Sequence, residues 1–483
     1  MKKYTITNST IINGIALGFS LAFFLASFIG ALYAGEWGEV FYNWYLIMIS
    51  PCPLVTDYFA LGGLAGTFLN AGACGLACFL FMVLLKGKSR ANTLAGYFLV
   101  VTHCFYGLNF LNMWPCFLTV LLYLKVRNLD YKKNLHVCMF ATCFGPFISE
   151  LLFRYTQGEY VLGEVHLTVL GVILTASFSL MLGFLIPAIL PGTHAWHKGY
   201  TLYNGGLACG LLGFFLFTFL YRTMGFHNHG HVARDNAIYE QFHHSFGVFA
   251  NLFFLSVFAL CFAAGWALNG RSLKGFDHLV KDTGYSSDFA DKYGMPLCLI
   301  NIACLGSLFL LYLNLSIRFT EGSGFTGPTA GVVLASLTFT AMGEHPKNVW
   351  PILAGYQLLS LLVHMVCAAA GAEVPWSLST QGYITSAAFA LGLCPIVGRY
   401  GIRAGIAAGF MCASLCTSTS ALHGGLILYN GGFTTGITVL ILLPVLEHYI
   451  PNTRQEMKNQ TINMQDMLTL IGNLSSRDKS QDS

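Results

Sequence analysis

The chain has 483 residues, of which 55% are hydrophobic and only 10% are charged, and its formal net charge is +4. A soluble domain carries about 25% charged residues, so most of this chain cannot face water. So small a net charge does not indicate a nucleic-acid partner. The composition predicts an all-α integral membrane protein whose main partner is the lipid bilayer.

Apolar segments recur from residue 11 almost to residue 450, and a transmembrane helix needs about 20 such residues. In the first half we expect segments at 10–34, 58–85, 92–106, 111–126, 134–153, 162–190 and 199–221. In the second half we expect 245–268, 293–316, 326–342, 349–371, 379–397, 401–420 and 425–447. The third and fourth segments of each half are short, so each pair could be one broken or re-entrant unit. The total is therefore about 12 to 14 transmembrane helices.

These segments divide the chain into four parts. We expect a first membrane repeat at 1–222, a histidine-rich connecting loop at 223–244, a second repeat at 245–450 and a polar cytoplasmic tail at 451–483. The loop contains five histidines: His227, His229, His231, His243 and His244. They could gather a divalent metal, but a solvated loop is the expectation, with no metal and no cofactor.

Basic residues predict the orientation, because short cytoplasmic loops are rich in lysine and arginine. The dense clusters of the first half are Lys86–Arg90 and Lys125–Lys133, and alternation of the segments puts both on one side. This predicts a multi-pass protein of the cell membrane with both termini in the cytoplasm. The residues that do not fit this assignment are Arg154, Arg222, Arg234 and Arg318.

Three motifs occur twice in the same order. In the first, Asp57, Gly63, Asn70 and Gly75 return as Asp288, Gly294, Asn301 and Gly306. In the second, Gly107, Asn112, Trp114 and Pro115 return as Gly343, Asn348, Trp350 and Pro351. In the third, His197, Gly199, Leu202-Tyr203-Asn204-Gly205-Gly206 and Gly210 return as His423, Gly425, Leu428-Tyr429-Asn430-Gly431-Gly432 and Gly436. The chain is therefore two homologous repeats, and an odd number of spans per repeat would invert one relative to the other.

The two Tyr-Asn-Gly-Gly elements interrupt apolar runs, and glycine lowers helix propensity by about 1 kcal/mol relative to alanine. We interpret them as helix breaks whose side chains, Tyr203, Asn204, Tyr429 and Asn430, face a polar cavity, because irregular backbone in a membrane must be covered by protein or water. Close helix packing through the glycines is the alternative. Such packing explains the glycines but not the Tyr-Asn pairs.

The Asn-x-Trp-Pro elements resemble helix starts, because asparagine caps helices and proline fits the first turn. A helix that starts inside the membrane would direct its N–H groups at a solute. A helix start at the membrane surface, with both tryptophans in the aromatic belt, is equally consistent. We include Asn112, Trp114, Asn348 and Trp350 as solute-binding candidates, together with Asn70 and Asn301.

His197 and His423 precede the Tyr-Asn-Gly-Gly elements and are candidates for carrying a coupled proton; helix capping is the alternative. Helix capping is also the expected role of Asp57 and Asp288. Glu344 and His345 have no charged counterpart in the first repeat, so they are further proton-coupling candidates or residues of a surface loop.

The segments His197–Gly206 and Gly343–Pro351 resemble a family of bacterial multi-pass membrane proteins known only as a domain of unknown function. Tyr203-Asn204-Gly205 and Tyr429-Asn430-Gly431 also resemble, more faintly, an element of urea channels, which likewise have two inverted halves. The chain length, the Asn-x-Trp-Pro elements and the missing Asn-Asn-Pro element differ from urea channels. That second resemblance therefore concerns architecture and not substrate.

The sequence predicts a transporter or channel for a small polar solute, neutral or weakly charged, with its site between the repeats near the bilayer midplane. A homo-oligomer is possible. The rival hypothesis is a membrane-embedded enzyme that uses Glu344 and His345, or a metal in the histidine-rich loop.

Overall fold

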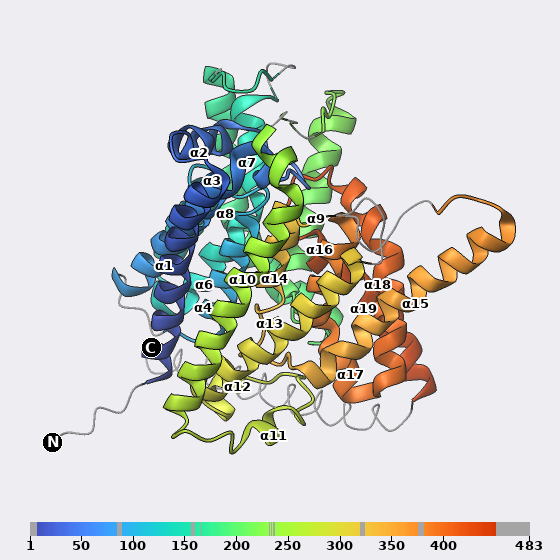
Figure 1. Cartoon of the computed structure of the whole chain (residues 1–483). Helices are drawn as coiled ribbons and strands as arrows, with labels where there is room; N and C mark the ends of the chain where they lie inside the picture. The colour runs from blue at the N-terminus through green and yellow to red at the C-terminus, as the bar shows by residue number, and fades with distance from the viewer. Residues whose placement is uncertain are drawn as a thin grey trace, which may run out of the picture.

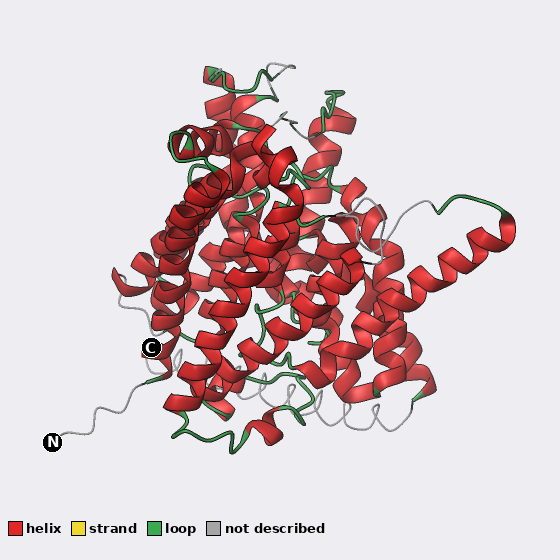
Figure 2. Ribbon diagram, viewed as in Figure 1, coloured by secondary structure: helices red, strands yellow, loops and turns green. Residues whose placement is uncertain are grey.

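The computed structural model describes residues 7–450, except for 85–88, 156–159, 166, 231, 233, 235–236, 319–323 and 375–380. This described part contains helices, turns and loops but no strand (Figure 2). Ten of its helices are long and apolar enough to cross a membrane. The predicted all-α, multi-pass membrane protein is therefore confirmed. The predicted tail at 451–483 lies outside the described residues.

The first half contains α1 (Asn8–Ala34), α2 (Val40–Ile49), α3 (Tyr58–Leu84), α4 (Ala91–His103), α5 (Trp114–Val126), α6 (Tyr131–Ala141), α7 (Gly145–Phe153), α8 (Val169–His197) and α9 (Asn204–Phe217). The second half contains α10 (Ala237–Leu268), α11 (Phe276–Leu279), α12 (Phe289–Lys292), α13 (Met295–Arg318), α14 (Gly327–Ala335), α15 (Pro346–Ala370), α16 (Gln381–Ala390), α17 (Cys394–Tyr400), α18 (Ile402–Leu422) and α19 (Asn430–Tyr449). Short 3₁₀ turns join α6 to α7 and α16 to α17, and a π turn extends α9 to Thr223.

Each expected segment corresponds to a helix or to a helix pair such as α6–α7. Helix α2 was not among the expected segments, and α10 begins at Ala237, eight residues before the predicted start. Helix α8 continues through Pro187 and Pro191 to His197, seven residues beyond the predicted end. Proline did not end this helix, although it removes a hydrogen bond there.

Equivalent hydrogen bonds in the two halves show the duplication directly. The Asn70 side-chain N–H donates to the carbonyl oxygens of Cys104 and Leu108, both at 2.9 Å. The Asn301 side-chain N–H donates to the carbonyl oxygens of Thr340 and Glu344, at 2.8 and 2.6 Å. The acceptors occupy the same positions relative to the second repeated motif in each half.

The repeated glycines Gly63 and Gly294 mark the same backbone break. Gly63 has a φ of 66°, inside α3, and Gly294 has a φ of 87°, between α12 and α13. Only glycine adopts such values freely. Helix α3 therefore corresponds to α12 and α13 together, and Asp57 and Asp288 accept backbone N–H bonds at the start of each unit, at 2.9 and 3.0 Å, as predicted for caps.

The two halves run in opposite directions through the bundle. In Figure 1, α1 leads from the N-terminal side of the bundle to α2 at the other end, whereas α10 leads back to α11 and α12 on the N-terminal side. We call the side that carries Asn8 and residues 282–294 the N-terminal face, because the Asn8 side chain bonds to Ala290 and Met295. The side that carries residues 50–57 is the opposite face.

The short helices form two hairpins that enter from opposite faces. The start of α4 lies beside Asp288, and the turn after α4 reaches the other side of the bundle, where Asn109 donates to the Ile47 carbonyl at 2.9 Å. The start of α14 lies beside Asp57, whose carboxylate accepts the Gly327 N–H at 2.9 Å. The turn after α14 lies beside Asp282, because His345 in this turn forms a hydrogen bond with the Asp282 carbonyl. The third and fourth segments of each half thus form one helical hairpin that turns at the far side of the bundle, and α15, the second arm in the second half, is itself long enough to cross a membrane.

Helices α9 and α19 cross where the two halves meet. A Cβ atom on Gly206 would lie 2.5 Å from the backbone of Gly432, and one on Gly210 would overlap the Phe433 ring. The equivalent contact joins Gly436 to Leu207. In each pair, a residue of one repeat contacts the position of the other repeat that is equivalent to its partner. Such reciprocal contacts are typical of a two-fold symmetric interface.

A side chain at the crossing should therefore destabilise the protein. We expect Gly206→Val to lower the free energy of unfolding by about 1–3 kcal/mol, the usual cost of overpacking. Thermal unfolding of the purified protein in detergent measures this effect. The matched control is Gly205→Ala, because a Cβ at Gly205 meets only Phe140, at 3.7 Å. Equal melting temperatures for both variants would contradict the crossing.

Candidate functional site

A cavity of about 540 Å³ opens on the N-terminal face and extends to the meeting point of the two repeats. Its mouth includes Ser286 and Asp288, and its buried end includes Tyr203, Phe339 and Tyr429. Further lining residues are Asn92, Phe140, His194, Asn204, Gly205 and Gly206. Both Tyr-Asn-Gly-Gly elements therefore contribute to one cavity, the first with four residues and the second with Tyr429.

The buried end of the cavity is aromatic. The Tyr203 ring packs against Phe339 and Phe389, with centroids 4.6 and 5.1 Å away. The Tyr429 ring lies 5.5 Å from the His103 ring. The alignment that pairs Gly107 with Gly343 also pairs His103 with Phe339, so each tyrosine contacts the same position of the other repeat.

The Tyr-Asn-Gly-Gly elements are helix starts and not mid-helix breaks. Tyr203 and Tyr429 are the residues before α9 and α19, and Asn204 and Asn430 are the first helical residues. The turn between α8 and α9 lies on the N-terminal face, where the Lys198 carbonyl accepts the Tyr285 hydroxyl, and the turn between α18 and α19 lies on the opposite face, where Gly425 bonds to Leu54. The predicted break within a spanning helix is therefore wrong, because each element lies in the connection between two separate helices.

Asn204 lines the cavity, but protein groups already use its amide. Its Oδ1 accepts from His197 Nε2 at 3.0 Å and from Thr193 Oγ1 at 2.7 Å, and its Nδ2 donates to the Leu190 carbonyl at 2.9 Å. Asn430 bonds in the same way to His423 and to the Cys416 carbonyl. These contacts give both asparagines the role of fixing a helix start against the preceding helix.

His197 and His423 are buried partners of these asparagines. The His197 Nδ1 accepts the Gly199 N–H at 3.2 Å, so Nε2 carries the proton donated to Asn204. Both ring nitrogens of this neutral form are in use. The observed bonds are those of the capping alternative, and proton coupling through these two histidines stays a prediction.

The amides of the other motifs shape the hairpin turns. Asn112 Nδ2 donates to the Gly107 carbonyl at 3.0 Å, and Asn348 Nδ2 donates to the Gly343 carbonyl at 2.8 Å. Asn112 is not the helix cap, because α5 begins at Trp114; in α15 the cap is His345, and Asn348 lies inside the first turn. Like Asn70 and Asn301, neither residue lines the cavity.

The two tryptophans of these motifs also lie away from the cavity. Trp114 packs in an aromatic group with Phe81, Phe110 and Phe117. Trp350 is 42% exposed on the surface of α15. These positions favour the alternative roles, in which Trp114 packs in the core and Trp350 lies at the membrane surface. Neither tryptophan lines the cavity, so the structure does not support solute binding by them.

Glu344 and His345 occupy the turn of the second hairpin and point to different partners. Glu344 Oε2 accepts the Phe339 N–H at 3.3 Å, whereas His345 Nε2 bonds to the Asp282 carbonyl at 2.9 Å. They therefore do not form a catalytic dyad with each other. Neither is a surface residue, since Glu344 is 0% and His345 is 1% exposed.

The loop at the cavity mouth is held by Asp282. Burial raises the pKa of this carboxyl, but bonds from Lys292, Ser287, the Gly284 N–H and Tyr293 outweigh burial and lower the pKa to about 2. Asp282 therefore stays ionised at every physiological pH. Its stabilising effect is present above the unfolded pKa near 4 and is lost only as the pH falls through about 2.

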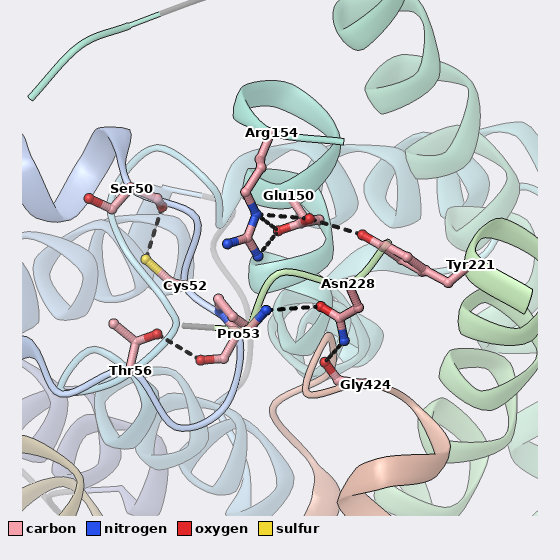
Figure 3. Close-up of polar contacts among 10 residues, drawn as sticks. Ser50, Cys52, Pro53, Thr56, Glu150, Arg154, Tyr221, Asn228 and Gly424 are labelled. Atoms are coloured by element: carbon pink, nitrogen blue, oxygen red, sulfur yellow. Dashed lines mark hydrogen bonds and ion pairs between the residues drawn. The ribbon is translucent and has the colours of Figure 1, made fainter. Parts of the chain in front are cut away.

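On the opposite face polar contacts join four parts of the chain (Figure 3). Glu150 forms a buried ion pair with Arg154 at 2.7 Å and accepts the Tyr221 hydroxyl at 3.0 Å. Nearby, the Leu54 N–H donates to the Gly425 carbonyl at 2.8 Å, and Asn228 reaches the Gly424 carbonyl. Arg154, which did not fit the predicted orientation, is thus neutralised inside the protein.

The histidine-rich loop shows no metal site in the part that the structure describes. His227 and His229 have ring centroids 4.9 Å apart, but among the described residues no group of three or more His, Cys, Asp or Glu side chains is placed to hold a metal ion. His231 lies outside the described residues, as do the side chains of His243 and His244.

The fold and the cavity define a multi-pass α-helical membrane protein made of two inverted repeats. The chain belongs to the family described as "Protein of unknown function (DUF1576)", which matches residues 37–222 and 268–448. The two matched regions fall in the two halves of the chain. No curated protein and no solved structure shows a significant match to it.

The bonds of Asn204 predict what its loss would do. Asn204→Leu leaves the buried N–H of His197 Nε2 without its acceptor, whereas Thr193 Oγ1 and the Leu190 carbonyl stay bonded to each other. One such unpaired buried group costs about 1–3 kcal/mol. We expect a lower melting temperature in detergent for this variant and for Asn430→Leu. The control is Asn92→Leu, because Asn92 lines the same cavity without a hydrogen bond to any described residue. A loss of stability in all three would point to a general effect of leucine.

Proposed function

We propose that the protein moves a small polar solute across the bilayer through the interface of its two repeats. The observation that carries this proposal is the cavity that ends where α9 and α19 cross, between Tyr203 of one repeat and Tyr429 of the other. In transporters built from inverted repeats, the solute site lies at the repeat interface near the midplane. A cavity in that place supports the same use here.

The lining of the cavity supports a neutral or weakly charged solute. Its inner part combines aromatic rings with Asn204 and backbone of Gly205 and Gly206, while the acidic Asp288 lies at the mouth. Among the residues that the structure describes, no lysine or arginine lines it. A solute with several charges would find no opposite charge at the buried end.

The conformation is open to the N-terminal face. On the opposite face the route is covered by Tyr429 and by the contacts between residues 54 and 425, next to the Glu150–Arg154 pair. The end of α19 lies on the same N-terminal face as the start of α1. Lys198 links the two, because its ammonium group pairs with Glu447 of α19 and its carbonyl oxygen accepts the hydroxyl of Tyr285 on this face. Arg90, Lys198, Lys292 and Arg399 lie on this face as well. Because basic residues gather in the cytoplasm, we assign this face, and both termini, to the cytoplasm of a cell-membrane protein.

A bulky residue inside the cavity should block transport without unfolding the protein. A Cβ at Gly205 has room, so Gly205→Trp places its ring in the cavity. We expect solute flux to fall to the level of protein-free liposomes in stopped-flow light scattering with urea, glycerol and acetamide. The wild type should be permeable to at least one of these solutes.

Two variants control this experiment. Gly205→Ala should keep wild-type flux, and Gly192→Trp adds the same ring at an exposed site on α8 with nothing within 4 Å. If Gly205→Trp retains full flux, the cavity is not the route.

A further inference from the structure

Two buried ionisable residues break the symmetry of the repeats beside the cavity. Glu344 stands where the first repeat has Leu108, and His103 stands where the second repeat has Phe339. Glu344 lies on the side of Tyr203, and His103 lies against Tyr429. The fold therefore accommodates an apolar residue at both positions, and neither charge is needed to build the hairpin turn.

Glu344 lacks the partners that buried carboxylates have elsewhere in this protein. Its Oε1 has no hydrogen-bond partner among the described residues, and Oε2 has a single bond of 3.3 Å. By contrast, Glu36 accepts the N–H groups of Leu64 and Ala65 at 3.0 and 2.8 Å, at the break in α3. Glu150 is satisfied by its ion pair and by Tyr221. A carboxylate as isolated as Glu344 is stable in protein only when it carries a proton.

The described groups near Glu344 include the wall of the cavity and no cation bound to its carboxyl group. Tyr203 faces it from the start of α9 and Cys394 from the start of α17, and neither is a cation. His345 follows it in the chain but is turned to the Asp282 carbonyl, and the Asp282 carboxylate is bound to Lys292. Phe339, whose N–H it accepts, lines the cavity together with Tyr203. Glu344 is thus directly behind the wall of the solute cavity.

His103 has a free acceptor position on the other side of the tyrosine pair. Its Nδ1 donates to the Leu99 carbonyl at 2.6 Å, and its Nε2 forms no hydrogen bond with a described residue. The titratable groups against its ring are Tyr106 and Tyr429. The Leu428 carbonyl lies near Nε2, ready to accept a hydrogen bond if Nε2 becomes protonated.

We propose that solute movement is coupled to a proton carried by Glu344 and His103. The inference rests on the proposed function and adds its driving force. A proton from the cavity side forms the O–H bond of Glu344, and that bond breaks when the proton returns to the solvent path. On the other side of the tyrosine pair, Nε2 of His103 takes up a proton, donates it to the Leu428 carbonyl and releases it toward the opposite face. No electron is transferred, and the net result is one proton moved with the solute.

The test uses the full chain in liposomes and the most permeant of urea, glycerol and acetamide. Uptake is measured with and without an imposed pH gradient for the wild type and for Glu344→Gln and His103→Phe. The second change introduces the residue that the other repeat has at this position. Glu36→Gln serves as the carboxylate control. Infrared difference spectra between acidic and alkaline pH report the carboxylic-acid C=O band of Glu344.

We expect the gradient to drive accumulation in the wild type and in Glu36→Gln. Glu344→Gln and His103→Phe should keep downhill flux and lose accumulation, and the C=O band should titrate in the wild type and be absent in Glu344→Gln. If downhill flux in the wild type does not depend on the pH gradient, proton coupling is contradicted, whereas the proposal of solute transport is not. Accumulation that survives in Glu344→Gln, or a band that does not titrate, would also overturn it. Absence of flux for all three solutes in the wild type would instead refute the proposed function itself.

Discussion

The contact between Gly206 and Gly432 is the constraint on which the architecture depends. Two helices approach this closely only where neither residue has a side chain, and here the approach places α9 of one repeat across α19 of the other. The residue before each helix is a tyrosine, so the same contact brings Tyr203 and Tyr429 to the end of one cavity. The cavity is thus a consequence of how the repeats join.

The membrane environment explains most of the repeated polar residues. A buried hairpin turn has carbonyl oxygens that water cannot reach, and each needs a donor from the protein. Asn70 and Asn301 supply two bonds each to their turns, and Asn112 and Asn348 supply one more to a glycine carbonyl. Repeated polar residues in a membrane protein can therefore form hydrogen bonds with buried backbone carbonyls and have no contact with the solute.

This distinction marks how far the sequence could predict the site. Apolar length, glycine and proline, and the repeated motifs predicted most of the helices, the pairing of the third and fourth segments and the duplication, because these can be seen in the chain without knowing its tertiary contacts. The partner of an amide is not local: Asn70 bonds to a carbonyl 34 residues away, and the role of Asn204 depends on α8 continuing through two prolines to its partner His197. His103 was missed, although aligning the repeats pairs it with Phe339 and would have revealed the asymmetry.

The central claim is that the two repeats are inverted, and the side from which matched loops are labelled tests it most directly. The exposed loop after α1 contains Gly38, and the exposed loop after α10 contains Lys274. Gly38→Cys and Lys274→Cys can be reacted in intact cells with a membrane-impermeant thiol reagent, and the described native cysteines are buried except for the half-buried Cys304 and Cys367. Inverted repeats predict that only the cysteine at Gly38, on the opposite face, is labelled from outside. Labelling of both positions, or of neither before the cells are opened, would place the loops on one side and contradict the inversion.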